Sequence, residues 1–119
     1  MKNYLKYCLL LTEVSSIVLL VLTLLYVLSG YGIVRTSIVR KLTFNLINRH
    51  VAERIHHDIF LRLLFNIFLL VHCLSGLILF IYRRVKNDTF RYILITISIL
   101  IPLYLLLPLM LIDLIDLLK

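Results

Sequence analysis

Three long apolar stretches, separated by polar segments, dominate the pattern of hydrophobic and polar positions along the chain. The first runs from about Tyr7 to Leu28, the second from Ile59 to Tyr82, and the third from Tyr92 to about Ile112. Each approaches or exceeds about 20 residues, the length that an α-helix needs to cross a bilayer. The pattern therefore predicts three transmembrane helices, at 7–28, 59–82 and 92–112.

The segment between the first two stretches, about 35–56, mixes apolar and basic residues. Its apolar positions recur mostly four residues apart, which is helical spacing. Basic residues lie between them, namely Arg35, Arg40, Lys41, Arg49 and Arg54. This mixture predicts an amphipathic helix in the headgroup region. We expect the turn residues Ser29–Gly32 (SGYG) to end the first helix, and the interfacial helix to run into the second span without a break.

Composition agrees with a membrane protein. Apolar residues make up 62% of the 119 residues and charged residues 16%, a balance that excludes disorder and does not resemble a soluble domain. The fold class predicted is an all-α integral membrane protein forming a single membrane domain over 1–119. The net charge of +7 suits anionic lipid headgroups. We expect no nucleic-acid partner, because no soluble basic domain exists to carry one.

The candidate functional residue is His72, in the middle of the second stretch. An ionisable ring at mid-membrane is energetically unfavourable and by default marks a functional site. A neutral imidazole ligates haem iron, and Gly76, one turn further, leaves room for a macrocycle or a close helix. Two other interpretations remain open: a hydrogen bond within a helix interface, and a proton relay with a carboxylate such as Glu13.

His57 lies fifteen residues before His72. On one continuous helix the two rings would differ by about 60° in direction and about 22 Å along the axis. His57 is thus a candidate second ligand of haem iron or a propionate contact, with a solvated helix face as the alternative. Arg54, Arg62 and Arg83 are candidates for pairing with haem propionates. We expect no divalent-metal site, because the histidines at 50, 56 and 57 lack a nearby cysteine, although Glu53 or Asp58 could supply a third ligand.

The run HCLSG, His72 to Gly76, resembles the mid-helix His-x-x-x-Gly of small cytochrome b anchor subunits. Within these, the region from about Arg54 to Arg84 is most similar to the three-span anchors of succinate dehydrogenase and fumarate reductase. The resemblance implies that His72 ligates a b-type haem, that quinone binds nearby, and that a sister anchor supplies the second ligand. It also implies an energy-transducing membrane, either a cell membrane or a mitochondrial inner membrane. The Asp-Tyr pair that many such anchors carry near the quinone is replaced here by Arg83 and Arg84.

Our functional hypothesis is therefore a haem b-binding membrane anchor of an electron-transfer complex, exchanging electrons with quinone and performing no bond chemistry alone. The second ligand would come from another chain, from Met110, or from His72 of a second copy. Two alternatives differ in class. One is a cofactor-free structural or assembly subunit of a larger membrane complex, and the other is a small oligomeric transporter or channel.

Overall fold

The computed structural model describes residues 3–119, which form helices and no strand. Three of the helices are long and apolar enough to cross a membrane, so the chain is an all-α membrane protein. In chain order the helices are α1 (Asn3–Val34), α2 (Thr36–Leu42), α3 (Arg49–His57), α4 (Ile59–Arg84) and α5 (Asp88–Leu118).

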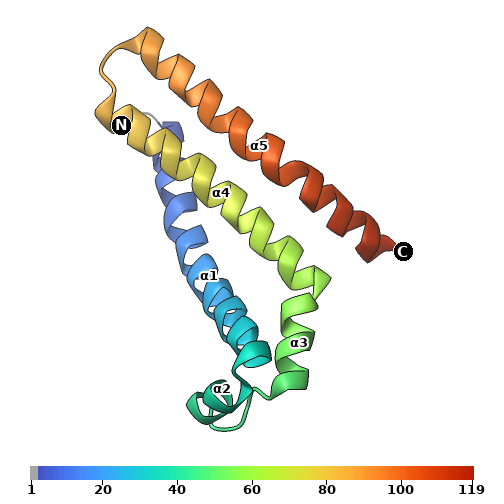
Figure 1. The fold of residues 1–119 in the computed structure, drawn as a ribbon. Coiled ribbons are helices and arrows are strands. Elements are labelled where there is room, and N and C mark those ends of the chain that lie inside the picture. The colour runs from blue at the N-terminus through green and yellow to red at the C-terminus, as the bar shows by residue number, and fades with distance from the viewer. Residues whose placement is uncertain (1–2) are drawn as a thin grey trace.

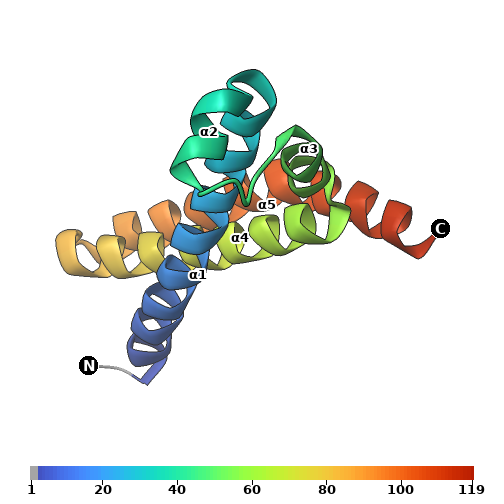
Figure 2. The same ribbon diagram turned by 90° about the horizontal axis from the view of Figure 1, so that it is seen from below.

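Helix α4 is the centre of the arrangement (Figure 1). It packs against α1 and against α5, whereas the main contacts of α5 are with α4. Helices α4 and α5 run side by side in opposite directions, and α1 crosses α4 obliquely (Figure 2). The short helices α2 and α3 both pack against α1. The three long helices therefore form an open array around α4 rather than a closed bundle.

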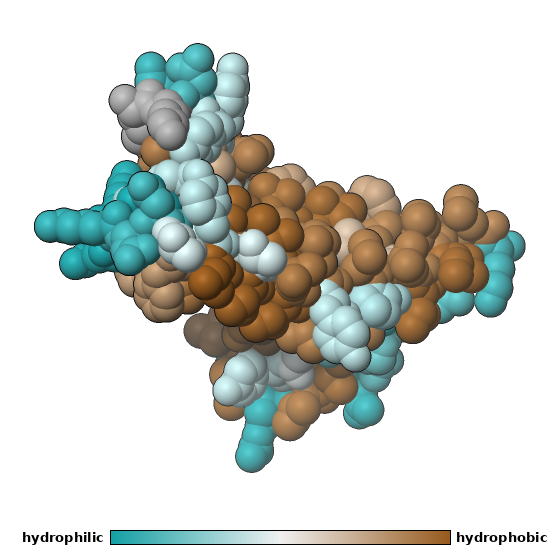
Figure 3. Space-filling view, turned by 90° about the horizontal axis from the view of Figure 1, so that it is seen from above, coloured by the Kyte–Doolittle hydropathy of each residue, from teal (hydrophilic) through white to brown (hydrophobic). Residues whose placement is uncertain are grey.

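Apolar side chains cover most of the surface, and little of the chain is buried. Brown apolar surface follows the long helices, and hydrophilic residues gather at the extremities (Figure 3). The buried apolar residues among those described are Leu22, Val39, Ala52, Leu79 and Ile81. A core this small cannot account for so much apolar sequence, which means that lipid solvates the outer faces of the long helices.

Helix α1 continues past Gly30 and Gly32 to Val34, so the expectation that SGYG ends the helix is wrong. Neither glycine adopts a positive φ angle. Gly32 instead allows close packing: a Cβ atom at this position would lie 2.7 Å from Cβ of Ala52 on α3. Small residues at membrane-helix interfaces permit such an approach, and this accounts for the glycines here.

The single interfacial helix expected at 35–56 is also wrong, because two short helices occupy this region. They are separated by a turn in which Phe44 and Asn45 both have positive φ angles, 51° and 68°. The side chains of Thr43 and Asn48 accept backbone N–H bonds in and after this turn, from Ile47 and Val51. Side chains that bond the local backbone compete with a continuous helix, which explains the interruption.

A second break, at Asp58, separates α3 from α4, contrary to the expected continuous helix. Asp58 has an extended backbone, and its carboxylate accepts a hydrogen bond from N–H of Leu61 at 2.8 Å. It is therefore the N-cap of α4, a role for which Asp is strongly preferred. The break places His57 and His72 on different helices, so the predicted angle between them on one helix does not apply.

Candidate functional site

His72 lies in a polar seam where α4 crosses α1. Its Nδ1 atom is 3.1 Å from Oγ of Ser15 and 3.3 Å from the carbonyl oxygen of Thr12. The Thr12 hydroxyl donates to Oγ of Ser75 at 2.8 Å, one turn along α4. Ser15 and Ser75 are both buried. Four polar residues from two spans thus satisfy one another within an apolar surrounding.

The contacts of Nδ1 favour one tautomer of the His72 ring. A carbonyl oxygen can only accept, so the tautomer with its proton on Nδ1 is the one that can hydrogen bond to the Thr12 oxygen. The Ser15 hydroxyl agrees, because it donates to the same carbonyl at 3.2 Å and has its lone pairs free to accept from Nδ1. In the neutral ring the lone pair is then on Nε2. No residue of the described chain hydrogen bonds to this atom, which leaves it available as a ligand.

Gly76 faces α1 rather than an open slot. A Cβ atom built on it would lie 3.9 Å from Cγ2 of Thr12, an ordinary van der Waals distance. Gly76 was expected to leave room either for a macrocycle or for a closely packed helix, and the structure shows the closely packed helix. Room for a macrocycle beside His72 would therefore lie on another side of α4.

His56, not His57, repeats the geometry of His72. Its Nδ1 atom is 3.1 Å from Oγ of Ser29, and the Ser29 hydroxyl donates to the carbonyl oxygen of Tyr26 at 2.9 Å. Both serines therefore bond the carbonyl three residues earlier and face a histidine. Ser15, Leu22 and Ser29 are all buried and are spaced seven residues apart on α1. Seven residues are two helical turns, so one stripe of α1 carries both contacts.

Tyr26 closes the junction of α1, α3 and α4. Its ring meets His56 and Phe65 edge-on, with centroids 5.9 Å and 5.4 Å apart. Its hydroxyl is buried and has no hydrogen-bond partner among residues 3–119. A buried hydroxyl without a partner is unfavourable, which makes this junction a place for a water molecule or a polar ligand atom.

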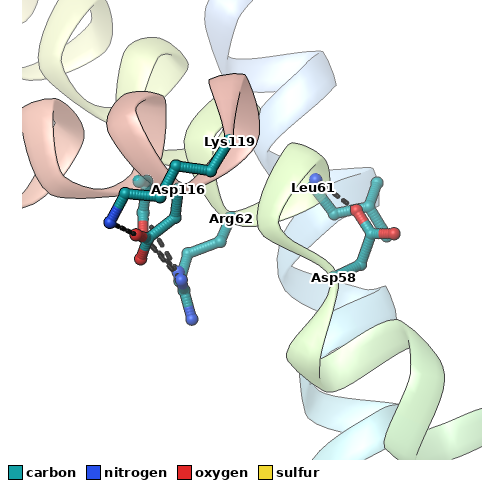
Figure 4. Close-up of polar contacts among 6 residues, drawn as sticks. Asp58, Leu61, Arg62, Asp116 and Lys119 are labelled. Carbon is teal, nitrogen blue, oxygen red and sulfur yellow. Dashed lines mark hydrogen bonds and ion pairs between the residues drawn. The ribbon is translucent and has the colours of Figure 1, made fainter.

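Arg62 forms an ion pair with Asp113. Its Nε and Nη2 atoms donate to the carboxylate of Asp113 at 2.5–3.0 Å. Figure 4 shows the guanidinium of Arg62 turned toward the end of α5 that carries Asp116 and Lys119. Asp113 is 5% exposed, whereas the Arg62 side chain is 43% exposed. The pair joins the start of α4 to the end of α5, and it leaves Arg62 less available for a haem propionate.

The other predicted site residues are not brought together with His72. His57 is exposed at the end of α3, and the 13 residues from Ile59 to His72 span about 20 Å of helix. Arg54 is exposed and its Nη2 atom is 3.4 Å from Nε2 of His50. Arg83 is exposed in the last turn of α4. His57 is therefore too far along the helices to share an iron with His72, and the pairing of Arg54 and Arg83 with haem propionates stays a prediction.

Met110 does not match His72 in depth. Arg62 and Asp113 set the register of the α4–α5 hairpin. His72 lies ten residues after Arg62 on α4, whereas Met110 lies only three residues before Asp113 on α5. The two side chains are thus about 10 Å apart along the helix axes, too far for opposite positions on one iron. Glu13, the expected relay partner, is exposed, and the hydrogen-bond partners of His72 are Ser15 and Thr12.

Within residues 3–119, no group of three or more His, Cys, Asp or Glu side chains could hold a metal ion. A haem iron needs only one or two protein ligands, so this finding does not bear on haem.

Sequence reasoning missed Ser15, Ser29 and His56, although a signal was present. Ser15 and Ser29 are fourteen residues apart, about four helical turns, and this spacing indicates a buried polar stripe. Sequence reasoning also assigned Arg62 to a haem propionate and did not foresee its pairing with Asp113. Opposite charges at similar distances from a helical hairpin loop would have indicated their pairing.

Comparisons of this chain with protein-family models, with curated proteins and with solved structures found no match. The functional argument therefore rests on the site itself.

Proposed function

We propose that the chain is a small membrane subunit that ligates a b-type haem through Nε2 of His72, in a complex that exchanges electrons with a quinone pool. The observation that carries this proposal is the pair of oxygen atoms, Oγ of Ser15 and the carbonyl oxygen of Thr12, at 3.1 Å and 3.3 Å from Nδ1 of His72. Metal-ligating histidines nearly always donate their other ring N–H to a carboxylate, carbonyl or similar acceptor. Ser15 and the Thr12 carbonyl supply that partner here.

The residues present fit one axial position of a haem. Ser15 and Thr12 orient the ring through Nδ1 and leave Nε2 on its opposite side without a hydrogen-bond partner in the described chain. The Thr12–Ser75 hydrogen bond holds α4 against α1 one turn away, so the ring has a rigid support. Haem, when bound, would supply one-electron chemistry, and the proposed exchange of electrons with quinone implies an energy-transducing membrane as the proposed location.

The second axial ligand is proposed to come from another chain. His57 and Met110 are too far from His72 along the helices, and Arg62 is paired with Asp113. A sister subunit or a second copy of this chain would supply the second ligand of the haem iron. It would also cover one exposed face of the α4–α5 hairpin.

The test is the optical spectrum of the complex purified from haem-supplied cells. We expect a dithionite-reduced α-band typical of b haems, lost in His72→Ala and kept in the matched control His57→Ala, whose side chain is exposed. A correctly assembled but colourless complex would refute the proposal. So would an unchanged band in His72→Ala.

The polar seam also favours a second function, a cofactor-free subunit whose histidines only join helices. Its supporting observation is that His56 makes the same contact with Ser29 as His72 makes with Ser15. Ser15→Ala separates the two functions. If His72 holds haem, losing the group that orients the ligand should weaken haem binding about 10–100-fold. If the seam is only structural, stability alone should fall.

A further inference from the structure

An apolar groove of about 600 Å³ lies between the end of α1 and α2. Its walls are Val27, Leu28 and Tyr31 from α1 and Ile38, Val39 and Leu42 from α2. Several of these side chains are more than half exposed, including Tyr31 at 63% and Leu42 at 68%. The groove is thus open along its length and suited to a hydrocarbon chain rather than to a compact polar ligand.

One cationic side chain lines this groove. Arg35 connects α1 to α2 and is exposed, and no residue of the described chain accepts a bond from its guanidinium. Arg40 and Lys41 follow on α2, and no acidic residue occurs from 14 to 52. The groove therefore combines apolar walls with an unpaired guanidinium in a positively charged surrounding.

The turn after α2 presents large apolar side chains to the outside of the protein. Phe44 is 88% exposed and Leu46 is 78% exposed. Phe44 has a φ angle of 51°, a conformation that is a genuine outlier for a bulky side chain. Arg40 stabilises the turn by donating to Oδ1 of Asn45 at 2.9 Å. A strained turn that presents large apolar side chains outward fits insertion among lipid tails, with the arginines at headgroup level.

We propose that the α1–α2 groove binds one anionic phospholipid, with an acyl chain along its apolar walls and the phosphate paired with Arg35. The occupant follows from charge complementarity: a guanidinium pairs bidentately with phosphate, and a net negative headgroup suits the surrounding positive charge. This site is separate from the His72 seam, so its test does not depend on haem.

The experiment is native mass spectrometry of the detergent-purified, delipidated protein, mixed with phosphatidylglycerol or with phosphatidylcholine of the same acyl chains. We expect one tightly retained phosphatidylglycerol and weaker retention of phosphatidylcholine. Arg35→Gln should lower phosphatidylglycerol retention about fivefold, the effect of one basic residue near an anionic lipid. Lys41→Gln is the matched control, because it removes the same charge from α2 outside the groove.

Equal loss in Arg35→Gln and Lys41→Gln would overturn the proposal, because it would show general attraction rather than a site. Equal retention of the two lipids would overturn it too. Val27→Trp, which fills the groove without changing charge, should reduce retention and gives a second test if Arg35→Gln fails to fold. Displacement of the lipid by excess inorganic phosphate would show that the apolar groove contributes nothing, which contradicts the proposal.

Discussion

The Oγ atom of Ser15 lies 3.1 Å from Nδ1 of His72, although the two residues are 57 positions apart in the chain. This contact joins the first and second spans and places an oxygen atom beside Nδ1 of the ring. The orientation of the ring, with Nε2 free of partners in the described chain, thus depends on a serine that would otherwise pass as a minor polar residue of a membrane helix.

Ser15→Ala should destabilise the α1–α4 interface by about 0.6–1.7 kcal/mol, the range measured for hydrogen bonds between membrane helices. The reason is that Nδ1 of His72 loses its better acceptor. The measurement is reversible unfolding in detergent for Ser15→Ala, His72→Ala and the double variant. Because the two residues interact directly, the effects should not add. Strict additivity would show that the contact does not form.

The ion pair between Arg62 and Asp113 should respond unequally to loss of either partner. Arg62→Met leaves a buried carboxylate without a partner and should destabilise the protein by about 3–5 kcal/mol. Asp113→Asn should have a smaller effect, because the half-exposed guanidinium can turn to headgroups or water.

The double variant Arg62→Met with Asp113→Leu is the control for this prediction. An apolar pair in place of a buried ion pair is often neutral, so most of the lost stability should return. Unfolding in detergent measures all three variants. A larger loss for Asp113→Asn than for Arg62→Met would contradict the burial described.

Gly32 and Gly76 should differ sharply in their tolerance of alanine. At Gly32 the new methyl group would lie 2.7 Å from Cβ of Ala52, so α1 and α3 would have to separate. Overpacking of this kind costs about 1–3 kcal/mol. At Gly76 the nearest side-chain atom is 3.9 Å away, and the added methyl should be accommodated. Thermal unfolding of Gly32→Ala and Gly76→Ala measures this difference in stability. Equal unfolding midpoints would refute the close approach of α1 and α3 at Gly32.

His56 and His57 are neighbours in sequence but should behave differently. His56→Ala removes the bond to Ser29 and should cost about 0.6–1.7 kcal/mol. His57→Ala removes an exposed ring and should change stability by less than about 0.5 kcal/mol. The same unfolding assay measures both. A larger effect for His57 would contradict the placement of these rings.

The three spans could be predicted from the sequence because about 20 consecutive apolar residues have few other stable environments than a bilayer. Each helix extends beyond its predicted C-terminal end, by six residues in α1 and α5 and by two in α4, since a helix can continue through interfacial residues. The start of α4, Ile59, is the predicted one. The break at Asp58 was not predicted, because an N-cap aspartate starts a helix without a Gly or Pro residue to mark the boundary.

The site was predicted only in part. His72 is conspicuous because an imidazole in an apolar span is rare. Its partners are not conspicuous in the sequence, because Ser15 contacts His72 only as a result of the way in which α1 crosses α4. The choice between His56 and His57 likewise depends on which ring faces α1, and the helix phase could not give this once the chain breaks at Asp58.

The central claim is that His72 carries its proton on Nδ1 and leaves Nε2 free as a ligand. Nitrogen-15 solid-state NMR of histidine-labelled protein in bilayers tests this directly, with His72→Ala to assign the signals. We predict a protonated Nδ1 and an unprotonated Nε2, with only the Nε2 signal lost or strongly shifted when haem is added. A proton on Nε2 of His72 in the haem-free protein would contradict the account.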